Sequence, residues 1–184
     1  GNASLTDVET GEKRHTFRAH SSGATVVDFS RDSKRVATGS QDHTVRVYDV
    51  DTGDPLLVVR GHWQYITDID FSPDGKRLAT GSGDGSARVW NIADRIAKAD
   101  HVAEVLAEER AVHLGHEAGM EAQILYGHKG PVYDVAISPD GNFVATSAMG
   151  TGHGDQQICV WSKPDAAVVA GFPVKAGYLH TFSF

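Results

Sequence analysis

Residues 70–90, DFSPDGKRLATGSGDGSARVW, are repeated with few changes at residues 28–48 as DFSRDSKRVATGSQDHTVRVY. A looser copy, AISPDGNFVATSAMGTGHGDQQICVW, runs over residues 136–161. His20 and His62, which precede the first two copies, lie 42 residues apart, and His128 follows after a further 66 residues. A period near 42 is typical of small sheets that bury their faces only against neighbouring copies.

Each copy divides into four strand candidates. In the second copy the alternating segment at residues 65–71 is followed by Ser72-Pro73-Asp74-Gly75. Proline favours the second position of a type I turn and glycine the fourth, so these residues predict a hairpin turn. Residues 77–82 and 86–92 form the next two strand candidates, and a fourth precedes the following Gly-His pair. Four short antiparallel strands per repeat predict one small sheet for each copy.

The motifs within each copy resemble those of WD40-repeat proteins, a β-propeller family, in a bacterial style. The motifs that carry this resemblance are Gly61-His62, FSPDG, LATGS, and Asp84 placed six residues before Trp90. The Asp spacing recurs from Asp42 to Tyr48 and from Asp155 to Trp161. The resemblance implies an all-β fold, a propeller of four-stranded antiparallel blades. The ring is expected to be incomplete, with three full blades, flanking strands and one short helical insertion.

The repeat boundaries predict one partial propeller over residues 1–184. Its expected parts are the end of a preceding blade (5–18), three blades (20–60, 62–126 and 128–172) and the first strand of a further blade (177–184). Seven blades, the usual number in the family that the chain resembles, would need about 290 residues. The sequence is therefore expected to be a piece of a longer propeller, or else several copies self-associate to close the ring.

The extra residues in the second blade, 93–121, are rich in Ala, Glu and Leu. Apolar residues recur three or four apart from Ile96 to Leu106, which predicts an amphipathic helix. Asp94 is the expected N-cap and Gly115 the expected end. The helix is expected on the face opposite the Gly-His loops.

The family resemblance also implies a buried hydrogen-bond network in each blade. Its expected members are His20, Thr38, Asp42 and Tyr48; His62, Thr80, Asp84 and Trp90; and His128, Thr146, Asp155 and Trp161. The first blade departs from the pattern, because Tyr48 stands where the others have Trp. His, Thr and Asp together also suggest catalysis. The threefold recurrence favours a structural role, since a single active site does not require it.

Two further segments contain residue types that also occur in ligand sites. His113, His116 and Glu117 lie at the end of the predicted helix with loose spacing, and a solvated loop explains them better than a metal site. The Gly-rich residues 148–157 lack the Lys and Ser/Thr of a phosphate loop. The single cysteine, Cys159, alternates with apolar residues and is expected in the core. We expect no metal and no cofactor.

Charge and motifs together narrow the class of function. The net charge of −7 and the absence of Lys/Arg runs argue against nucleic acid and an anionic membrane as partners. No catalytic motif is recognisable. The preferred interpretation is a non-catalytic scaffold that binds a protein or peptide. The alternatives are a WD40 sensor or regulatory domain of a larger signalling enzyme, such as a kinase, NTPase or protease, and an enzyme whose site is the helical insertion.

Aromatic and charged residues near the Gly-His loops are the candidates for partner contact. They are Trp63, Tyr65, Tyr133, His43 and Lys129. Trp and Tyr are enriched among interface hot spots. For Tyr65 and Tyr133 the alternative is simple packing between neighbouring blades.

Overall fold

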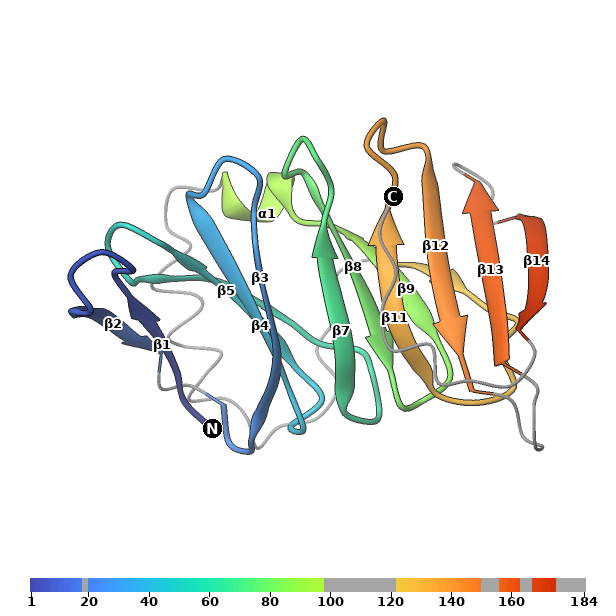
Figure 1. Cartoon of the computed structure of the whole chain (residues 1–184), viewed down its shortest axis with the longest axis horizontal. Coiled ribbons are helices and arrows are strands. Elements are labelled where there is room, and N and C mark those ends of the chain that lie inside the picture. The colour runs from blue at the N-terminus through green and yellow to red at the C-terminus, as the bar shows by residue number, and fades with distance from the viewer. Residues whose placement is uncertain (18–19, 98–121, 150–155, 163–166, 175–184) are drawn as a thin grey trace.

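The computed structural model describes residues 1–17, 20–97, 122–149, 156–162 and 167–174. Within these residues the strands form three four-stranded antiparallel sheets and one two-stranded sheet. The sheets stand side by side in chain order, with the two-stranded sheet at the N-terminal end (Figure 1). The expected all-β architecture, an incomplete propeller of four-stranded blades, is confirmed.

The first and second blades repeat the same up-and-down order of strands. The first blade consists of β3 (Ala24–Phe29), β4 (Arg35–Ser40), β5 (Val45–Asp49) and β6 (Pro55–Val59). The second consists of β7 (Ile66–Phe71), β8 (Arg77–Ser82), β9 (Ala87–Asn91) and β10 (Ala122–Leu125). In each blade the first strand contacts the first strand of the next blade, so β3, β7 and β11 are the inner strands of the array.

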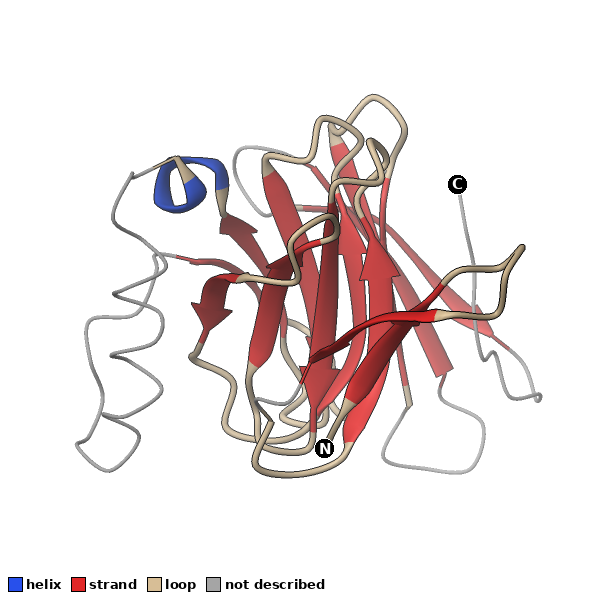
Figure 2. Ribbon diagram, turned by 90° about the vertical axis from the view of Figure 1, so that its left-hand side faces the viewer, coloured by secondary structure: helices blue, strands red, loops and turns tan. Residues whose placement is uncertain are grey.

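The remaining elements flank these two blades. The third blade consists of β11 (Val132–Ile137), β12 (Phe143–Ala148), β13 (Gln156–Ser162) and β14 (Val168–Val174). The two-stranded sheet pairs β1 (Ala3–Thr6) with β2 (Lys13–Phe17). The helix α1 (Ala93–Ile96) follows β9 and lies outside the strand layers (Figure 2). No helix among the described residues is long and apolar enough to cross a membrane.

The turn after each inner strand has the predicted geometry. In the second blade the Gly75 amide donates to the Ser72 carbonyl at 2.7 Å, and Gly75 has a φ of +65°. A residue with a side chain pays a steric penalty at that angle, so glycine fits the position. In the first blade Ser33 occupies it with a φ of 58°.

The core lies between the blades, because each sheet packs one face against the next. Ala37, Val45 and Val47 of the first blade cluster with Ile69, Phe71 and Leu78 of the second. A second hydrophobic cluster repeats this arrangement between the second and third blades. Cys159 is buried in that second cluster, at the position expected for a core residue.

Polar side chains on the inner strands also join neighbouring blades. The Thr25 hydroxyl donates to the Ile66 carbonyl at 2.7 Å, and the Asp28 carboxylate accepts from the Phe71 amide at 3.0 Å. One period later the Thr67 hydroxyl donates to the Val132 carbonyl at 2.6 Å. The Asp70 carboxylate accepts from the Ile137 amide at 2.5 Å. We call this pair of contacts, one from a Thr and one from an Asp three residues later, the inter-blade clamp.

A β-bulge places the threonine of the clamp. The register of the inner strand shifts between Ala24 and Val26 in the first blade and between Ile66 and Asp68 in the second. A bulge leaves one residue out of the ladder and turns its side chain aside. Thr25 and Thr67 are those residues, so their hydroxyls reach the next blade.

The helix begins differently from the sequence prediction. Its N-cap is Ile92, which makes no side-chain cap hydrogen bond, and Asp94 lies in the first turn. The prediction of Asp94 as N-cap is therefore wrong. Ile92 is fully buried and its amide donates to the Lys76 carbonyl at 2.9 Å, so packing and backbone pairing set the start of the helix. The predicted continuation to Gly115, with His113, His116 and Glu117, lies outside the described residues.

The carboxylates between blades predict a dependence of stability on pH. Burial raises the pKa of Asp70 to about 6 against the hydrogen bond from the Ile137 amide, and Asp28 and Asp134 add to the rise. The folded pKa thus lies above the unfolded value near 3.9. Ionisation of Asp70 disfavours the fold as pH rises from ~4 through ~6, and this destabilisation is fully present above that range.

Asp70→Asn is therefore expected to raise the free energy of unfolding by ~1–2 kcal/mol at pH 7.5 and to leave it nearly unchanged at pH 4. The amide oxygen can still accept from Ile137. Urea denaturation at the two pH values measures the difference, with Asp51→Asn at an exposed turn as the control. A larger stabilisation at pH 4 than at pH 7.5 would contradict the argument.

Candidate functional site

The loops that precede the inner strands are built on a buried chain of side-chain hydrogen bonds. In the second blade Trp90 Nε1 donates to Thr80 Oγ1 at 2.9 Å. His62 Nε2 lies 2.7 Å from Thr80 Oγ1, and His62 Nδ1 lies 2.8 Å from Asp84 Oδ2. The hydrogen-bond network thus runs from β9 through β8 to two loops, the one that precedes β7 and the one that joins β8 to β9.

The hydrogen-bond donors in this network determine which of its atoms carry a proton. Indole can only donate, so the Thr80 hydroxyl accepts from Trp90 and donates a hydrogen bond to His62 Nε2, while His62 Nδ1–H donates to the Asp84 carboxylate. Burial lowers the pKa of His62, against the opposing effect of Asp84. Burial alone would raise the pKa of Asp84, but the hydrogen bonds from His62 and Ser86 outweigh it and hold that pKa below its usual range. The pair is a neutral imidazole on a carboxylate.

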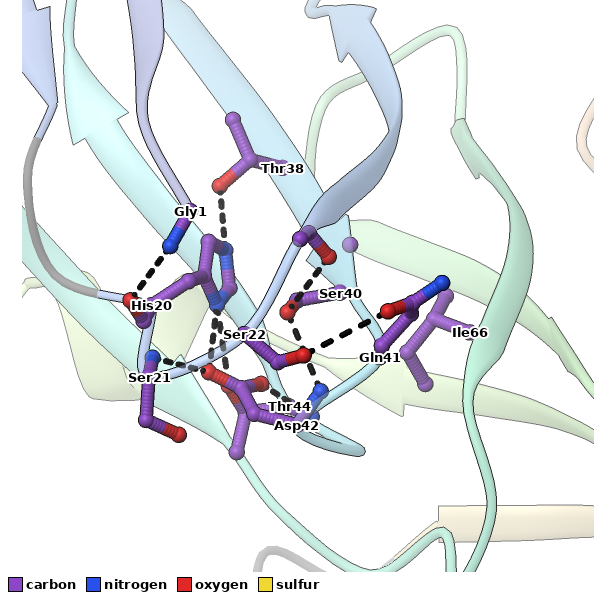
Figure 3. A network of polar contacts seen from close by, with 12 residues as sticks. Gly1, His20, Ser21, Ser22, Thr38, Ser40, Gln41, Asp42, Thr44 and Ile66 are labelled. Atoms are coloured by element: carbon purple, nitrogen blue, oxygen red, sulfur yellow. Dashed lines mark hydrogen bonds and ion pairs between the residues drawn. The ribbon is translucent and has the colours of Figure 1, made fainter.

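The first blade repeats the network, as Figure 3 shows. His20 Nε2 lies 2.8 Å from Thr38 Oγ1, and His20 Nδ1 lies 3.0 Å from Asp42 Oδ2. Tyr48, at the tryptophan position, is buried and stacks on Phe17 with ring centroids 4.5 Å apart. The tyrosine therefore packs toward the two-stranded sheet, which supplies Phe17 from β2.

The third blade shows the same inner part of the network. His128 Nε2 lies 2.6 Å from Thr146 Oγ1, to which Trp161 Nε1 donates at 2.7 Å. The His128 and Trp161 rings make a T-shaped contact, with 71° between their planes. Asp155, the expected carboxylate, lies outside the described residues.

The structure adds members that the sequence did not suggest. The Thr44 hydroxyl donates to Asp42 Oδ1 at 2.6 Å, and the Ser86 hydroxyl donates to Asp84 Oδ1 at 2.7 Å. Ser40 and Ser82 instead hold loop carbonyls, at Gly23 and Tyr65 respectively. Thr44 and Ser86 are 42 residues apart, so the repeat period applied to every polar residue would have found them.

The network fixes the backbone that carries Trp63. The Trp63 amide donates to Asp84 Oδ2 at 3.2 Å, next to the buried His62. The Trp63 side chain is nevertheless 65% exposed. A large aromatic side chain thus projects into solvent from a loop whose backbone is held.

The other predicted contact residues lie in different settings. The Tyr65 ring, 38% exposed, lies against Gly83, where a Cβ would fall 2.5 Å from the ring. His43 and Lys129 are exposed, and His43 has a φ of 69° in a turn where the second blade has Gly85. Tyr133 lies on the inner strand β11, at the bulge position of Thr25 and Thr67, and is 39% exposed. The structure therefore groups Trp63 and Tyr65 on one loop and places Tyr133 on a strand.

Among the described residues, one exposed tyrosine was not among the predicted contact residues. Tyr126 follows β10 directly, precedes Gly127-His128 and is 71% exposed. Its position corresponds to Arg60 in the first blade, so an aromatic residue next to a Gly-His pair was the available signal.

Within the described part of the chain, no group of three or more His, Cys, Asp or Glu side chains is arranged to hold a metal ion.

Comparison with protein-family models agrees with this architecture. The model described as "WD domain, G-beta repeat" (WD40) matches residues 11–49, 53–91 and 119–162, more than half of the chain. Each matched segment begins at or before the outer strand of one sheet and ends with the third strand of the next, so one repeat links two blades. WD40 domains are generally non-catalytic and typically bind protein partners. The chain belongs to the WD40-repeat family and has the interaction-scaffold architecture of that family.

Proposed function

We propose that the chain is a non-catalytic scaffold that binds a protein or peptide segment through the loops around Trp63. The observation that carries the proposal is the contrast within this loop, where Trp63 is 65% exposed while its amide is bonded to the buried Asp84. Holding the backbone in advance reduces the conformational entropy lost on binding. Exposed Trp and Tyr side chains on such a surface are typical contact residues.

The charges of these loops indicate the chemistry of the partner. Asp42 and Asp84 lie in the loops between the second and third strands, but their side chains are only 7% and 0% exposed because they serve the networks. His43 and Lys129 are exposed in the same set of loops. The described part of this loop face therefore presents aromatic rings with basic or neutral groups, although the chain carries a net charge of −7. A peptide with an apolar anchor and acidic flanking residues fits this combination.

Nucleic acid and an anionic membrane fit this surface less well. Both need clustered cations, because their affinity comes from many simultaneous phosphate contacts. Lys129 and His43 belong to different blades and are separated in the sequence. We therefore propose a protein partner, with Trp63 as the anchor and Lys129 as a nearby charge.

Trp63→Ala is expected to weaken the binding of peptides selected on the intact chain by ~30-fold or more, the effect typical of an interface anchor. The probes are peptides obtained by display selection from a random library on the immobilised chain. Fluorescence anisotropy with each labelled peptide measures the affinity. The free energy of unfolding is expected to stay within ~0.5 kcal/mol, because the side chain is a surface residue.

Phe172→Ala is the matched control, since Phe172 is 54% exposed but lies on the outer strand β14 and not in these loops. It is expected to leave the peptide affinity unchanged. Selected peptides that bind the Trp63→Ala and native chains equally would refute the proposed site.

A further inference from the structure

The second blade carries an arginine at a position where the hydrogen-bond network does not require one. Arg88 lies on β9, two residues before Trp90. The corresponding residue of the third blade, two residues before Trp161, is Cys159. The third blade nevertheless keeps the hydrogen bonds that join Trp161 to Thr146 and Thr146 to its histidine. The guanidinium of Arg88 is therefore not needed to build the network.

The structure holds this guanidinium group in place at the surface. Arg88 Cζ lies 5.8 Å from the centroid of the Trp90 ring, and Nε makes a long hydrogen bond of 3.4 Å to Ser86 Oγ. Nη1 lies beside Gly61, where a Cβ would fall 2.9 Å from it. Gly61 is exposed, and the first blade has Ala19 at its position. Stacking on the indole orients the group, and the absence of a side chain at Gly61 leaves room for it.

The same corner of the blade carries Trp63. The Trp63 amide and the Ser86 hydroxyl donate to the two oxygens of Asp84, at 3.2 and 2.7 Å. Arg88 Nε reaches the same Ser86 hydroxyl. Burial lowers the pKa of His62, the residue directly before Trp63, and the positive charge of Arg88 adds to this effect. The exposed indole of Trp63 and the guanidinium of Arg88 are therefore joined through one small cluster.

The positive charge of this corner is not neutralised by the protein. Arg88 and Arg60, which directly precedes Gly61, are both half-buried. The ion pairs that the structure describes include neither arginine. The carboxylate of Asp84 already accepts from His62 and its other donors. Arg60 Nη2 is buried and lacks a hydrogen-bond partner among the residues that the structure describes. Since a guanidinium carries several N–H donors and no acceptor, an anionic group fits here.

We infer that Arg88 binds a carboxylate of the partner segment, from an Asp or Glu residue next to the apolar anchor that contacts Trp63. The inference rests on the proposed function, because it assigns the acidic flanking residue of that partner to one side chain. The planar guanidinium matches a carboxylate through parallel N–H···O hydrogen bonds. The half-buried setting favours a carboxylate over a phosphate group, whose larger charge is costlier to remove from water.

Pairs of peptides test the inference. The probes are the peptides selected by display on the immobilised chain and, for each, a second peptide with Asn or Gln in place of the acidic residue beside the anchor. On the native chain the amide peptide is expected to bind ~10-fold more weakly, because a hydrogen-bonded charge pair is lost. On the Arg88→Gln chain the two peptides are expected to bind within about twofold of each other. Fluorescence anisotropy measures these affinities.

Two further variants control for net charge and for folding. Arg31→Gln removes a positive charge from an exposed residue in the turn between β3 and β4, and it is expected to keep the ~10-fold difference between the peptides. Arg88→Cys introduces the residue that the third blade has at this position, and it is expected to abolish the difference as Arg88→Gln does. Urea denaturation of each variant shows that the fold is retained.

Three results would overturn the inference. The difference between acidic and amide peptides could be the same on the native, Arg88→Gln and Arg88→Cys chains, which would place the carboxylate elsewhere. The selected peptides could lack an acidic residue beside the anchor. Peptides with phosphoserine at that position could bind more tightly than the acidic ones, which would make a phosphate the ligand. In each of these cases Trp63→Ala still weakens binding, whereas a loss of that effect refutes the proposed function and this inference with it.

Discussion

Trp90→Ala is expected to lower the free energy of unfolding by ~3–5 kcal/mol, the range for truncating a buried aromatic side chain. Trp90 is 1% exposed, its Nε1 donates to Thr80 Oγ1 at 2.9 Å, and its ring makes a T-shaped contact with the His62 ring. The substitution leaves a cavity in the core between the first two blades and also removes a hydrogen bond from the network. Urea denaturation followed by circular dichroism measures the change.

Two variants separate the packing of Trp90 from its hydrogen bond. Trp90→Phe keeps most of the ring but loses the donor, and the expected loss is ~1–2 kcal/mol. Trp63→Ala removes an equally large side chain from the surface, where the expected change is within ~0.5 kcal/mol. A loss below ~1 kcal/mol for Trp90→Ala would show that the core does not depend on this residue.

Asp84→Ala is expected to lower the free energy of unfolding by ~2–4 kcal/mol at neutral pH, because several buried or half-buried donors lose their acceptor. The carboxylate accepts from His62 Nδ1 at 2.8 Å, from the Ser86 hydroxyl at 2.7 Å and from the Trp63 amide at 3.2 Å. The neutral side chain of Asp84→Asn keeps one acceptor oxygen, so its expected loss is smaller. Asp51→Ala, at an exposed turn, is the control.

The effect of Asp84→Ala should depend on pH. The hydrogen bonds from His62 and Ser86 overcome the opposing effect of burial and hold the folded pKa of Asp84 below the unfolded value. A carboxyl group of this kind stabilises the fold above pH ~4 and loses that contribution as pH falls toward the folded pKa. The free energies of unfolding of the native and Asp84→Ala chains should therefore differ most at about pH 6–8 and converge in acid. A constant difference between about pH 7 and pH 3 would contradict the charged role of Asp84.

The two groups of buried carboxylates act on stability in opposite directions. Asp84 lies among donors that favour its charge, whereas burial raises the pKa of Asp70 to about 6. Burial and the neighbouring Asp134 likewise raise the pKa of Asp68. One repeat thus holds acidic residues that are stabilising at neutral pH in the loop network and destabilising between the inner strands.

The repeat itself led to the correct fold. The Ser-Pro-Asp-Gly turn after Phe71, the 42-residue spacing of His20 and His62 and the alternating strands are local features, and they are sufficient to predict four strands per copy. The start of the helix was not predictable in the same way. Capping preferences favoured Asp94 as the N-cap, but the burial of Ile92 and its backbone hydrogen bond to Lys76 place the N-cap two residues earlier, at Ile92.

By itself the sequence determined the blade pattern and the types of residue at each repeated position, because both follow from short-range periodicity. Only the tertiary structure decided which of those equivalent positions are covered. Phe29 and Phe71 occupy the same place in the repeat, yet one is 47% and the other 6% exposed. Thr67 and Tyr133 likewise share a bulge position, but the described contacts give only Thr67 a clamp to the next blade. Burial and pairing across blades join residues 40 or more positions apart, as in the contact from Thr25 to Ile66, so they depend on the neighbouring sheet and not on the local sequence.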